Sequence, residues 1–369
     1  MIESPGLIYT ILMFLLVISV LVFVHEMGHY LVARWLGVKS DTFSIGFGRE
    51  IAGWTDRRGT RWKIGWMPLG GYVKFAGDMN AVSQPDIAAQ TLPDEEKARL
   101  FQFRPVWQRF AIVAAGPLIN FLLAIVIYMA VFGTYGMPQN PAVVSGVTED
   151  SVAQSAGFEV GDRILSVDGR SIDRFEELAE IVMLRPDQSM RFSIERDGQT
   201  VTLEAAPEET IVTDRFGNEA RIGRLGVEGN LLEIEPLGIL ELPGAAIERT
   251  GANLEMILVG LRQIVTGQRS VQELGGPLKI AQYSGQTASL GLYAFLMFVA
   301  IISINLGFIN LLPIPMLDGG HLVFYAAEAV RRKPVGAEAQ EWAFRMGLVV
   351  LLGFMIMVTF IDLSSFGLF

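Results

Sequence analysis

Cysteine is absent from this sequence of 369 residues, and histidine occurs three times. Without cysteine there are no disulfide bonds and no thiolate metal ligands. A tightly bound transition metal would therefore have to be held by histidine, aspartate or glutamate. The sequence also lacks a basic tract, and its net charge is −10, which excludes the usual pattern of a nucleic-acid-binding protein.

Charged residues of either sign are scarce, and the sequence contains several long apolar runs. Charged residues make up 18% of the chain and hydrophobic residues 51%, and the mean hydropathy is +0.40. A bilayer span takes about 20 residues, and the stretches that are long enough are 7–35, 110–132, 290–312 and 342–361. The first has no basic segment before it and no small-residue cleavage site after it, so we expect a retained span rather than a signal peptide. The sequence predicts a polytopic α-helical membrane protein with four transmembrane helices.

Lysine and arginine predict the orientation of these spans. The loop after the first span is rich in both, and the loop before the last span carries Arg331, Arg332 and Lys333. The residues before the first span carry neither. We therefore expect both loops to be cytoplasmic, and both termini and the acid-rich segment 133–285 to be on the opposite side of the membrane, in a multi-pass membrane protein.

The motif His25-Glu26-Met27-Gly28-His29 lies inside the first apolar run. Residues i and i+4 share one face of a helix, so His25 and His29 can bind one metal ion from the same side. Glu26 can reach a water molecule on that metal, which is the zinc-protease arrangement. A structural histidine pair is the alternative, but three titratable groups within five residues of a span are costly unless they serve a function.

A catalytic zinc ion usually has three protein ligands and one position for water. The third ligand is expected in the segment 305–321, where Asp318 ends the longest apolar stretch at about the membrane depth of the two histidines. Prolines and glycines break the helix there, and irregular backbone at membrane depth is tolerated where it lines a cavity. His321 is a rival ligand, with a supporting or structural role as its alternative.

Aromatic and β-branched residues flank Pro68-Leu69-Gly70-Gly71 in the first cytoplasmic loop, a pattern typical of a β-hairpin that turns at these residues. Its tryptophan and tyrosine residues suit a membrane interface. The hairpin is either an ordinary surface element or an edge strand that holds an extended substrate by backbone pairing. The sequence fits both alternatives.

The segment 137–210 is expected to form a small α+β domain. Its patterns predict short strands, a helix near 175–183, and two closing strands at 190–196 and 199–204. The run from Ala156 to Gly169 resembles the signature of PDZ domains, and the resemblance extends over about 142–206 in a single copy. It implies a groove that binds an extended peptide by strand addition.

Between this domain and the third span, apolar residues recur at helical spacing from Ile247 to Val265, after short strands expected at 211–229. The pattern predicts an amphipathic helix on the membrane surface, and a helix packed on the soluble domain is the alternative. The expected domains are then 1–136 with the first two spans and the hairpin loop, 137–210 with the PDZ domain, 211–285 with the strands and the amphipathic helix, and 286–369 with the last two spans.

Three features together resemble the site-2 proteases, the zinc intramembrane metalloproteases. They are the histidine motif in the first span, the sequence Asn-Leu-Leu-Pro-Ile-Pro-Met-Leu-Asp-Gly at 310–319, and the PDZ-like domain between them. Gly116-Pro117-Leu118-Ile119-Asn120 in the second span also fits. The resemblance covers essentially the whole chain and is greatest to the bacterial proteases that regulate sigma-E, with one PDZ domain in place of two.

The resemblance implies zinc on His25, His29 and Asp318, with Glu26 as the catalytic base. It also implies a membrane-reentrant β-hairpin near Gly70 and Gly71, and a bacterial inner membrane with both termini and the PDZ domain in the periplasm. Further substrate-binding residues implied by the family pattern are Asn305, Asn310, Pro313 and Pro315.

The implied activity is a zinc-dependent endopeptidase that cleaves single-span membrane proteins in regulated intramembrane proteolysis. Its partners would be an anti-sigma factor-like substrate that has been shortened outside, the lipid bilayer and a peptide in the PDZ groove, but no nucleic acid. Two alternatives are a membrane-bound PDZ scaffold and a metal transporter. A structural zinc site would want four protein ligands, and a transporter has no need of Glu26 or a PDZ domain.

Overall fold

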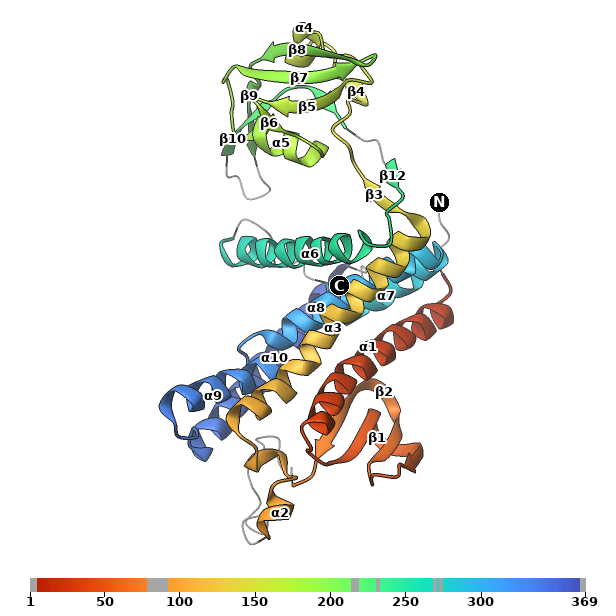
Figure 1. The fold of residues 1–369 in the computed structure, drawn as a ribbon, viewed down its shortest axis with the longest axis vertical. Helices are drawn as coiled ribbons and strands as arrows, with labels where there is room; N and C mark the ends of the chain where they lie inside the picture. The colour runs from red at the N-terminus through yellow and green to blue at the C-terminus, as the bar shows by residue number, and fades with distance from the viewer. Residues whose placement is uncertain are drawn as a thin grey trace. The chain divides into compact units, whose positions relative to one another are not determined.

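The structure is a computed structural model, and it describes residues 5–77, 92–213, 219–229, 233–267, 271 and 275–365. Figure 1 follows the chain from α1 in red to α10 in blue. The chain divides into two compact units. One combines Met1–Val131 with Leu240–Phe369, and the other is Phe132–Ile239.

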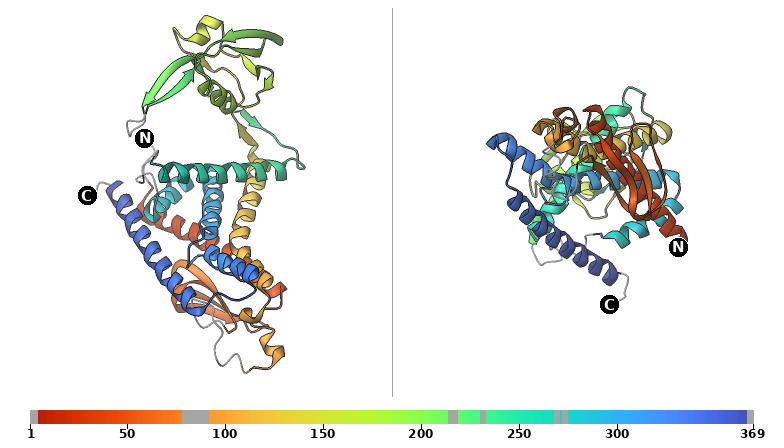
Figure 2. Two further views of the ribbon diagram at one scale, coloured as in Figure 1. Left: turned by 90° about the vertical axis from the view of Figure 1, so that its left-hand side faces the viewer. Right: turned by 90° about the horizontal axis from the view of Figure 1, so that it is seen from below.

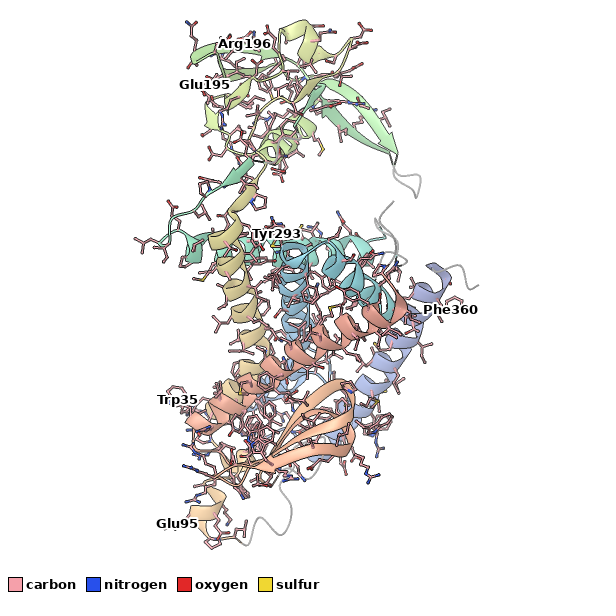
Figure 3. The ribbon with its side chains drawn as sticks, turned by 90° about the vertical axis from the view of Figure 1, so that its right-hand side faces the viewer. Trp35, Glu95, Glu195, Arg196, Tyr293 and Phe360 are labelled. Atoms are coloured by element: carbon pink, nitrogen blue, oxygen red, sulfur yellow. The ribbon has the colours of Figure 1, made fainter. Side chains whose placement is uncertain are left out.

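In the described part of the chain, four helices are long and apolar enough to cross a membrane. They are α1 (Leu7–Trp35), α3 (Val106–Tyr135), α8 (Leu292–Leu311) and α10 (Ala337–Ser365). Each matches one span expected from the sequence to within a few residues, which confirms this part of the predicted fold. Large apolar side chains remain exposed along them; those of Trp35 and Phe360, labelled in Figure 3, are 84% and 58% exposed. Such surface suits contact with lipid.

Glycine lets the helices α1, α3 and α8 approach closely. A Cβ atom added to Gly28 of α1 would overlap the backbone carbonyl of Ala115 in α3. One added to Gly307 of α8 would lie 2.9 Å from the carbonyl oxygen of Pro117 in α3, and α8 runs beside α3 in Figure 2. Helices in a membrane associate through close van der Waals contact, which small residues permit. The histidine motif of α1 is thereby held against α3.

The chain breaks its helical path directly after α8. Pro313 and Pro315 come shortly after the last residue of α8, and the helix ends there because proline has no N–H donor and cannot continue a helix. Met316, which follows them, takes a φ of 87°. A new helix, α9 (Asp318–Arg331), begins at the aspartate. Cβ atoms on Gly319 or Gly320 would overlap carbonyl groups of this tight turn. The helix break expected from the prolines and glycines is therefore present, and it places Asp318 at a helix N-terminus.

Two long strands, β1 (Ser40–Thr55) and β2 (Arg61–Phe75), follow α1. The turn between them is at 56–60, where the Asp56 carboxylate accepts hydrogen bonds from the backbone of Arg58 and Thr60 and from Trp62 Nε1. Burial alone would raise the pKa of Asp56, but these hydrogen bonds outweigh it and hold the pKa below its usual value. The expected placement of this turn at 68–71 is wrong, because the Asp56 hydrogen bonds stabilise the earlier turn.

The segment 68–71 is instead a bend within β2. The two halves of β2 lie on different sides of β1, so that Ile64 and Gly71 are both opposite Ile45. Gly70 takes a φ of 119°, which favours glycine. The last part of β2, residues 71–75, has a strand neighbour on one side only within the described residues, and it therefore forms an edge of the sheet.

Helix α6 (Leu242–Val265) includes the amphipathic stretch expected from the sequence. It packs on α8, and Asn253 Nδ2 on its buried face donates a 2.7 Å hydrogen bond to the buried Tyr128 hydroxyl of α3. A neighbouring stripe is apolar and exposed; it includes Ile247, Leu258 and Val265.

Helix α7 (Pro277–Ser289) was not expected. The carboxylate of Asp362 in α10 caps its N-terminus and accepts hydrogen bonds of 2.9, 3.0 and 3.2 Å from the backbone of Gly276, Leu278 and Lys279. This cap joins α7 to the last spanning helix. Two short helices, α2 (Asp94–Lys97) and η2 (Phe101–Phe103), lie between β2 and α3.

The unit Phe132–Ile239 contains a four-stranded sheet in the order β6-β5-β7-β8. These strands are β5 (Arg163–Val167), β6 (Arg170–Ser171), β7 (Met190–Arg196) and β8 (Gln199–Ala205), and α5 (Phe175–Met183) packs on their core. The helix and the two closing strands confirm the sequence prediction almost to the residue. The carboxylate of Asp162, which is 1% exposed, pairs with Arg196 of β7, so this part of the PDZ-like signature stabilises the fold.

Further strands join the two ends of this unit. β4 (Gly146–Val147) pairs with β11 (Val227–Glu228), and β3 (Met137–Gln139) pairs with β12 (Glu233–Glu235). The remaining elements are α4 (Val152–Ala156) and the hairpin of β9 (Glu208–Thr213) and β10 (Glu219–Arg224). Part of the strand region expected at 211–229, namely 214–218, lies outside the described residues. The pairing of β3 with β12 brings the first and last strands of the unit together.

Candidate metal centre

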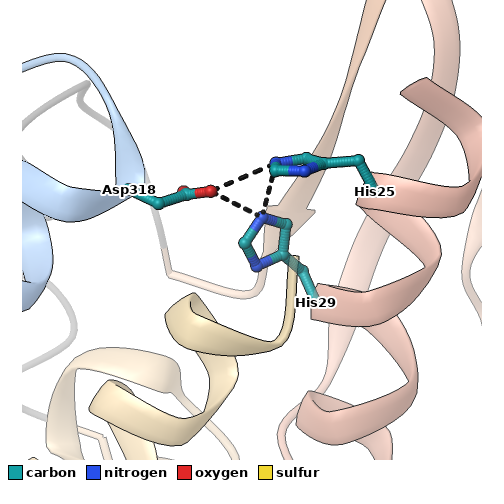
Figure 4. Close-up of side chains that lie close together, drawn as sticks. All are labelled: His25, His29 and Asp318. Carbon is teal, nitrogen blue, oxygen red and sulfur yellow. Dashed lines mark hydrogen bonds and ion pairs between the residues drawn. The ribbon is translucent and has the colours of Figure 1, made fainter. Parts of the chain in front are cut away.

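Three side chains from α1 and α9 converge on one point (Figure 4). Asp318 Oδ2 lies 3.1 Å from His25 Nε2 and 3.4 Å from His29 Nε2, and the two Nε2 atoms are 3.3 Å apart. Both histidines are 8% exposed, and the Asp318 side chain is 19% exposed. The structure thus brings together the three residues that were predicted as ligands.

The separations of these three atoms fit a single zinc ion. Ligand atoms about 2.1 Å from zinc at the corners of a tetrahedron lie roughly 3.4 Å apart, and the observed separations are 3.1, 3.3 and 3.4 Å. Two nitrogen atoms and a carboxylate oxygen are also the donor types that zinc accepts. The residues present therefore fit zinc.

Helix α3 supplies the outer partners of both imidazoles. The carbonyl oxygen of Ile112 lies 2.9 Å from His29 Nδ1, and the side-chain amide of Asn120 lies 2.9 Å from His25 Nδ1. Gly116, between these two partners, leaves the room for His29, because a Cβ atom there would overlap the imidazole ring. Sequence reasoning assigned these residues no role, since residues 83 and 95 positions apart meet only through the packing of α1 on α3.

Glu26 lines a cavity of 290 Å³ together with His25, His29 and Asp318. The cavity is also lined by Tyr72, Val73, Asn310 and His321. A carboxylate, a candidate metal centre and a strand edge therefore open onto the same space.

The predicted substrate-binding residues differ in whether they line this cavity. Of these, Asn310 lines it, and a Cβ atom on Gly71 would be 3.5 Å from Glu26 Cγ. Gly70 lies against the ring of Phe47 instead. The remaining members of the predicted set are outside the cavity lining: Asn305, Pro313 and Pro315.

His321, the rival ligand, lies one helical turn beyond Asp318 on α9 and lines the cavity. Its ring is 5.0 Å from the ring of Phe344 and 6.3 Å from that of Tyr325, measured between centroids. Among the described residues, the group of three whose donor atoms all lie within 4.8 Å of one another contains Asp318 and not His321. This geometry favours Asp318.

Comparison with known proteins fits this geometry. The model of peptidase family M50 matches residues 13–354. The chain belongs to peptidase family M50. The matched residues include both histidines of the motif and Asp318.

Relatives of this M50 peptidase are similar along nearly their whole length. A protein of Agrobacterium fabrum that carries the name zinc metalloprotease is 45% identical over 95% of each chain. One of Brucella suis with the same name is 45% identical over 97% of this chain and 96% of its own. The metalloprotease MmpA of Caulobacter vibrioides is 37% identical over 99% of this chain and 98% of its own.

These similarities identify the M50 chain as a zinc metalloendopeptidase with Zn²⁺ as its cofactor, and its four apolar helices as those of a membrane protein. Neither of the two alternatives, a membrane-bound PDZ scaffold or a metal transporter, predicts an enzyme. Among solved structures, the PDZ domain of an SdrC-like protein from Listeria monocytogenes is 15% identical, with a TM-score of 0.20 over 25% of this chain and 90% of that domain. A score of this size supports no conclusion about the unit Phe132–Ile239.

Proposed function

We propose that this M50 protease is an intramembrane endopeptidase whose zinc ion is held by His25, His29 and Asp318. The observation that carries the proposal is the convergence of three ligand atoms within 4.8 Å of one another, two of them from a helix apolar enough to span a membrane. Titratable groups at such a depth are costly unless they are paired or bind a metal. The zinc centre would therefore lie at the depth of the membrane.

Glu26 is the proposed catalytic base. Bound zinc would polarise the scissile carbonyl and lower the pKa of a water molecule. Glu26 accepts a proton as that water oxygen bonds to the carbonyl carbon, and it delivers the proton to the leaving nitrogen as the C–N bond breaks. Tyr72 and Val73, in the edge segment of β2, line the same cavity as this carboxylate.

The proposed substrate is the membrane span of a single-span protein, in an extended conformation at the cut. A helix hides its carbonyl groups in its own hydrogen bonds, so the segment that is cut must unwind. The edge formed by residues 71–75 of β2 can replace the lost hydrogen bonds by strand addition, next to Glu26. Asn310, on the cavity wall, is placed to contact the same segment.

The proposed orientation follows from the lysine and arginine distribution of the loops. It puts the termini and the PDZ-like unit in the periplasm, and it puts the zinc centre toward the cytoplasmic end of α1. The exposed apolar stripe of α6 would then lie in the periplasmic membrane surface. A pre-trimmed anti-sigma factor-like protein is the class of substrate that fits, because only its span has to enter.

The test is cleavage of a single-span model protein by the purified zinc-loaded enzyme in lipid vesicles. The matched control is Glu26→Gln, which keeps size and shape but removes the base. We expect cleavage by the parent protein, loss of cleavage with a chelator, recovery with zinc, and no cleavage by the variant. Cleavage by the zinc-bound Glu26→Gln protein at the parental rate would contradict the assigned mechanism.

A further inference from the structure

The two histidines of the zinc centre differ in how their outer nitrogen atoms are held. His29 Nδ1 lies 2.9 Å from the backbone carbonyl of Ile112. A carbonyl oxygen can only accept, so this Nδ1 carries the hydrogen, and the lone pair of His29 is on Nε2, toward Asp318. The backbone of α3 therefore fixes the tautomer that a metal ligand requires.

His25 has a side chain in the corresponding place. Asn120 of α3 is 0% exposed, and its Nδ2 lies 2.9 Å from His25 Nδ1. In this orientation the amide donates to Nδ1, which puts the hydrogen of a neutral His25 on Nε2. A protonated Nε2 cannot bind a metal.

The other end of the same amide can take this place beside His25. Asn120 Oδ1 is buried and has no hydrogen-bond partner among the described residues, so rotation of the amide breaks no hydrogen bond at that end. Rotation of the amide by a half-turn exchanges Oδ1 and Nδ2 within nearly the same volume. Oδ1 then accepts a hydrogen from His25 Nδ1, and the His25 Nε2 lone pair is directed at the metal.

The rest of Asn120 is well held. Its backbone carbonyl oxygen accepts a 2.8 Å hydrogen bond from the buried Ser303 hydroxyl of α8, and a Cβ atom on Gly307 of α8 would be 3.3 Å from Asn120 Cβ. The side chain therefore reaches His25 from a fixed point between two spanning helices, and its amide rotation is the remaining degree of freedom.

We propose that Asn120 is a positioning residue of the zinc centre, which holds His25 in the Nδ1–H tautomer by accepting its hydrogen through Oδ1. This inference rests on the proposed assignment of His25 as a zinc ligand. The segment Gly116–Asn120 then has two roles at the zinc centre: Gly116 leaves space for the His29 ring, and Asn120 orients the His25 ring. Outer partners of this kind commonly contribute about 10- to 100-fold to metal affinity.

The test compares zinc affinity, by competition with a chelator, in the full-length protein and in Asn120→Leu and Asn120→Asp. Leucine removes the acceptor at similar volume, whereas aspartate keeps one. We expect affinity to fall about 10- to 100-fold for leucine and to stay within a few-fold of the parent for aspartate. Asn253→Leu is the matched control, because it makes the same change at a buried asparagine whose amide donates to Tyr128 and not to a histidine, and it should leave affinity unchanged.

A spectroscopic measurement separates this role from simple packing. The chain has three histidines, so ¹⁵N spectra of the labelled imidazoles can be assigned by substitution of each one. In the zinc-loaded parent, we expect the His25 signals to report a protonated Nδ1 and a metal-bound Nε2. Asn120→Ala, which adds no volume, replaces the leucine variant if leucine prevents insertion.

Two outcomes would overturn the proposal. In the first, leucine or alanine at 120 leaves zinc affinity and the His25 spectrum unchanged. In the second, aspartate lowers affinity as much as leucine does, which is the behaviour of a packing residue. His25→Ala tests the ligand assignment separately. If His25→Ala keeps the parental zinc affinity, His25 is not a ligand. If His25→Ala lowers the affinity strongly but the Asn120 variants do not, His25 remains a ligand and only the role of Asn120 is refuted.

Discussion

Gly116→Ala is the substitution for which the structure predicts the sharpest effect on the zinc centre. The added Cβ atom would overlap the His29 ring at Nε2, Cε1 and Cδ2, all within 3.0 Å. Overpacking of this kind typically costs about 1–3 kcal/mol, against a gain of about 1 kcal/mol in helix propensity for glycine to alanine. The larger effect is on zinc affinity, because the distances from the ligand atoms to the metal tolerate changes of only about 0.2 Å.

We expect Gly116→Ala to insert in the membrane but to bind zinc at least about 10-fold more weakly, with a parallel loss of cleavage. Zinc affinity is measured by chelator competition on the purified protein. Gly353→Ala in α10 is the matched control, since a Cβ atom there has no neighbour within 4 Å, and it should behave as the parent does. Parental zinc affinity in Gly116→Ala would show that His29 is not held where the structure puts it.

Three further predictions concern the site and the outer unit. Glu26→Gln should abolish cleavage with about one zinc ion still bound per chain by metal analysis, and substantial residual cleavage would refute the base assignment. Asp318→Asn should weaken zinc binding and remove activity whereas His321→Ala should retain zinc, and the reverse pattern would make His321 the ligand. β3 and β12 pair with each other, so residues 137–235 can be replaced by a short linker. If the unit controls access to the site, this variant should cleave an untrimmed substrate. Equal losses of cleavage on trimmed and untrimmed substrates, in a variant that still inserts in the membrane, would show that the unit is a docking or folding module.

The sequence predicted the elements whose signal is local. The four spans follow from apolar runs, and His25 and His29 share a face because the helical period places them four residues apart. Asp318 was predicted because it ends the longest apolar stretch at about the depth of the two histidines, where prolines and glycines break the helix. The strands β7 and β8 alternate buried and exposed residues, so their bounds were also readable.

Other features depend on contacts between distant parts of the chain. Asn120 matched the family pattern, but the sequence assigned it no role, because its contact with His25 arises only when α3 packs on α1. The turn between β1 and β2 was misplaced because 56–60 and 68–71 both carry turn residues, and the decision comes from hydrogen bonds to Asp56. The N-terminus of helix α7 is capped by Asp362, which lies 83 to 86 positions further along the chain.

The most direct test of the central claim is where the enzyme cuts. A single-span model substrate with an isotope-labelled span is incubated with the zinc-loaded enzyme in vesicles, and both products are identified by mass spectrometry. The account predicts one cut within the membrane span, lost on zinc removal and absent with Glu26→Gln. Zinc-dependent cuts confined to the soluble parts of the substrate, with the span left intact, would contradict it.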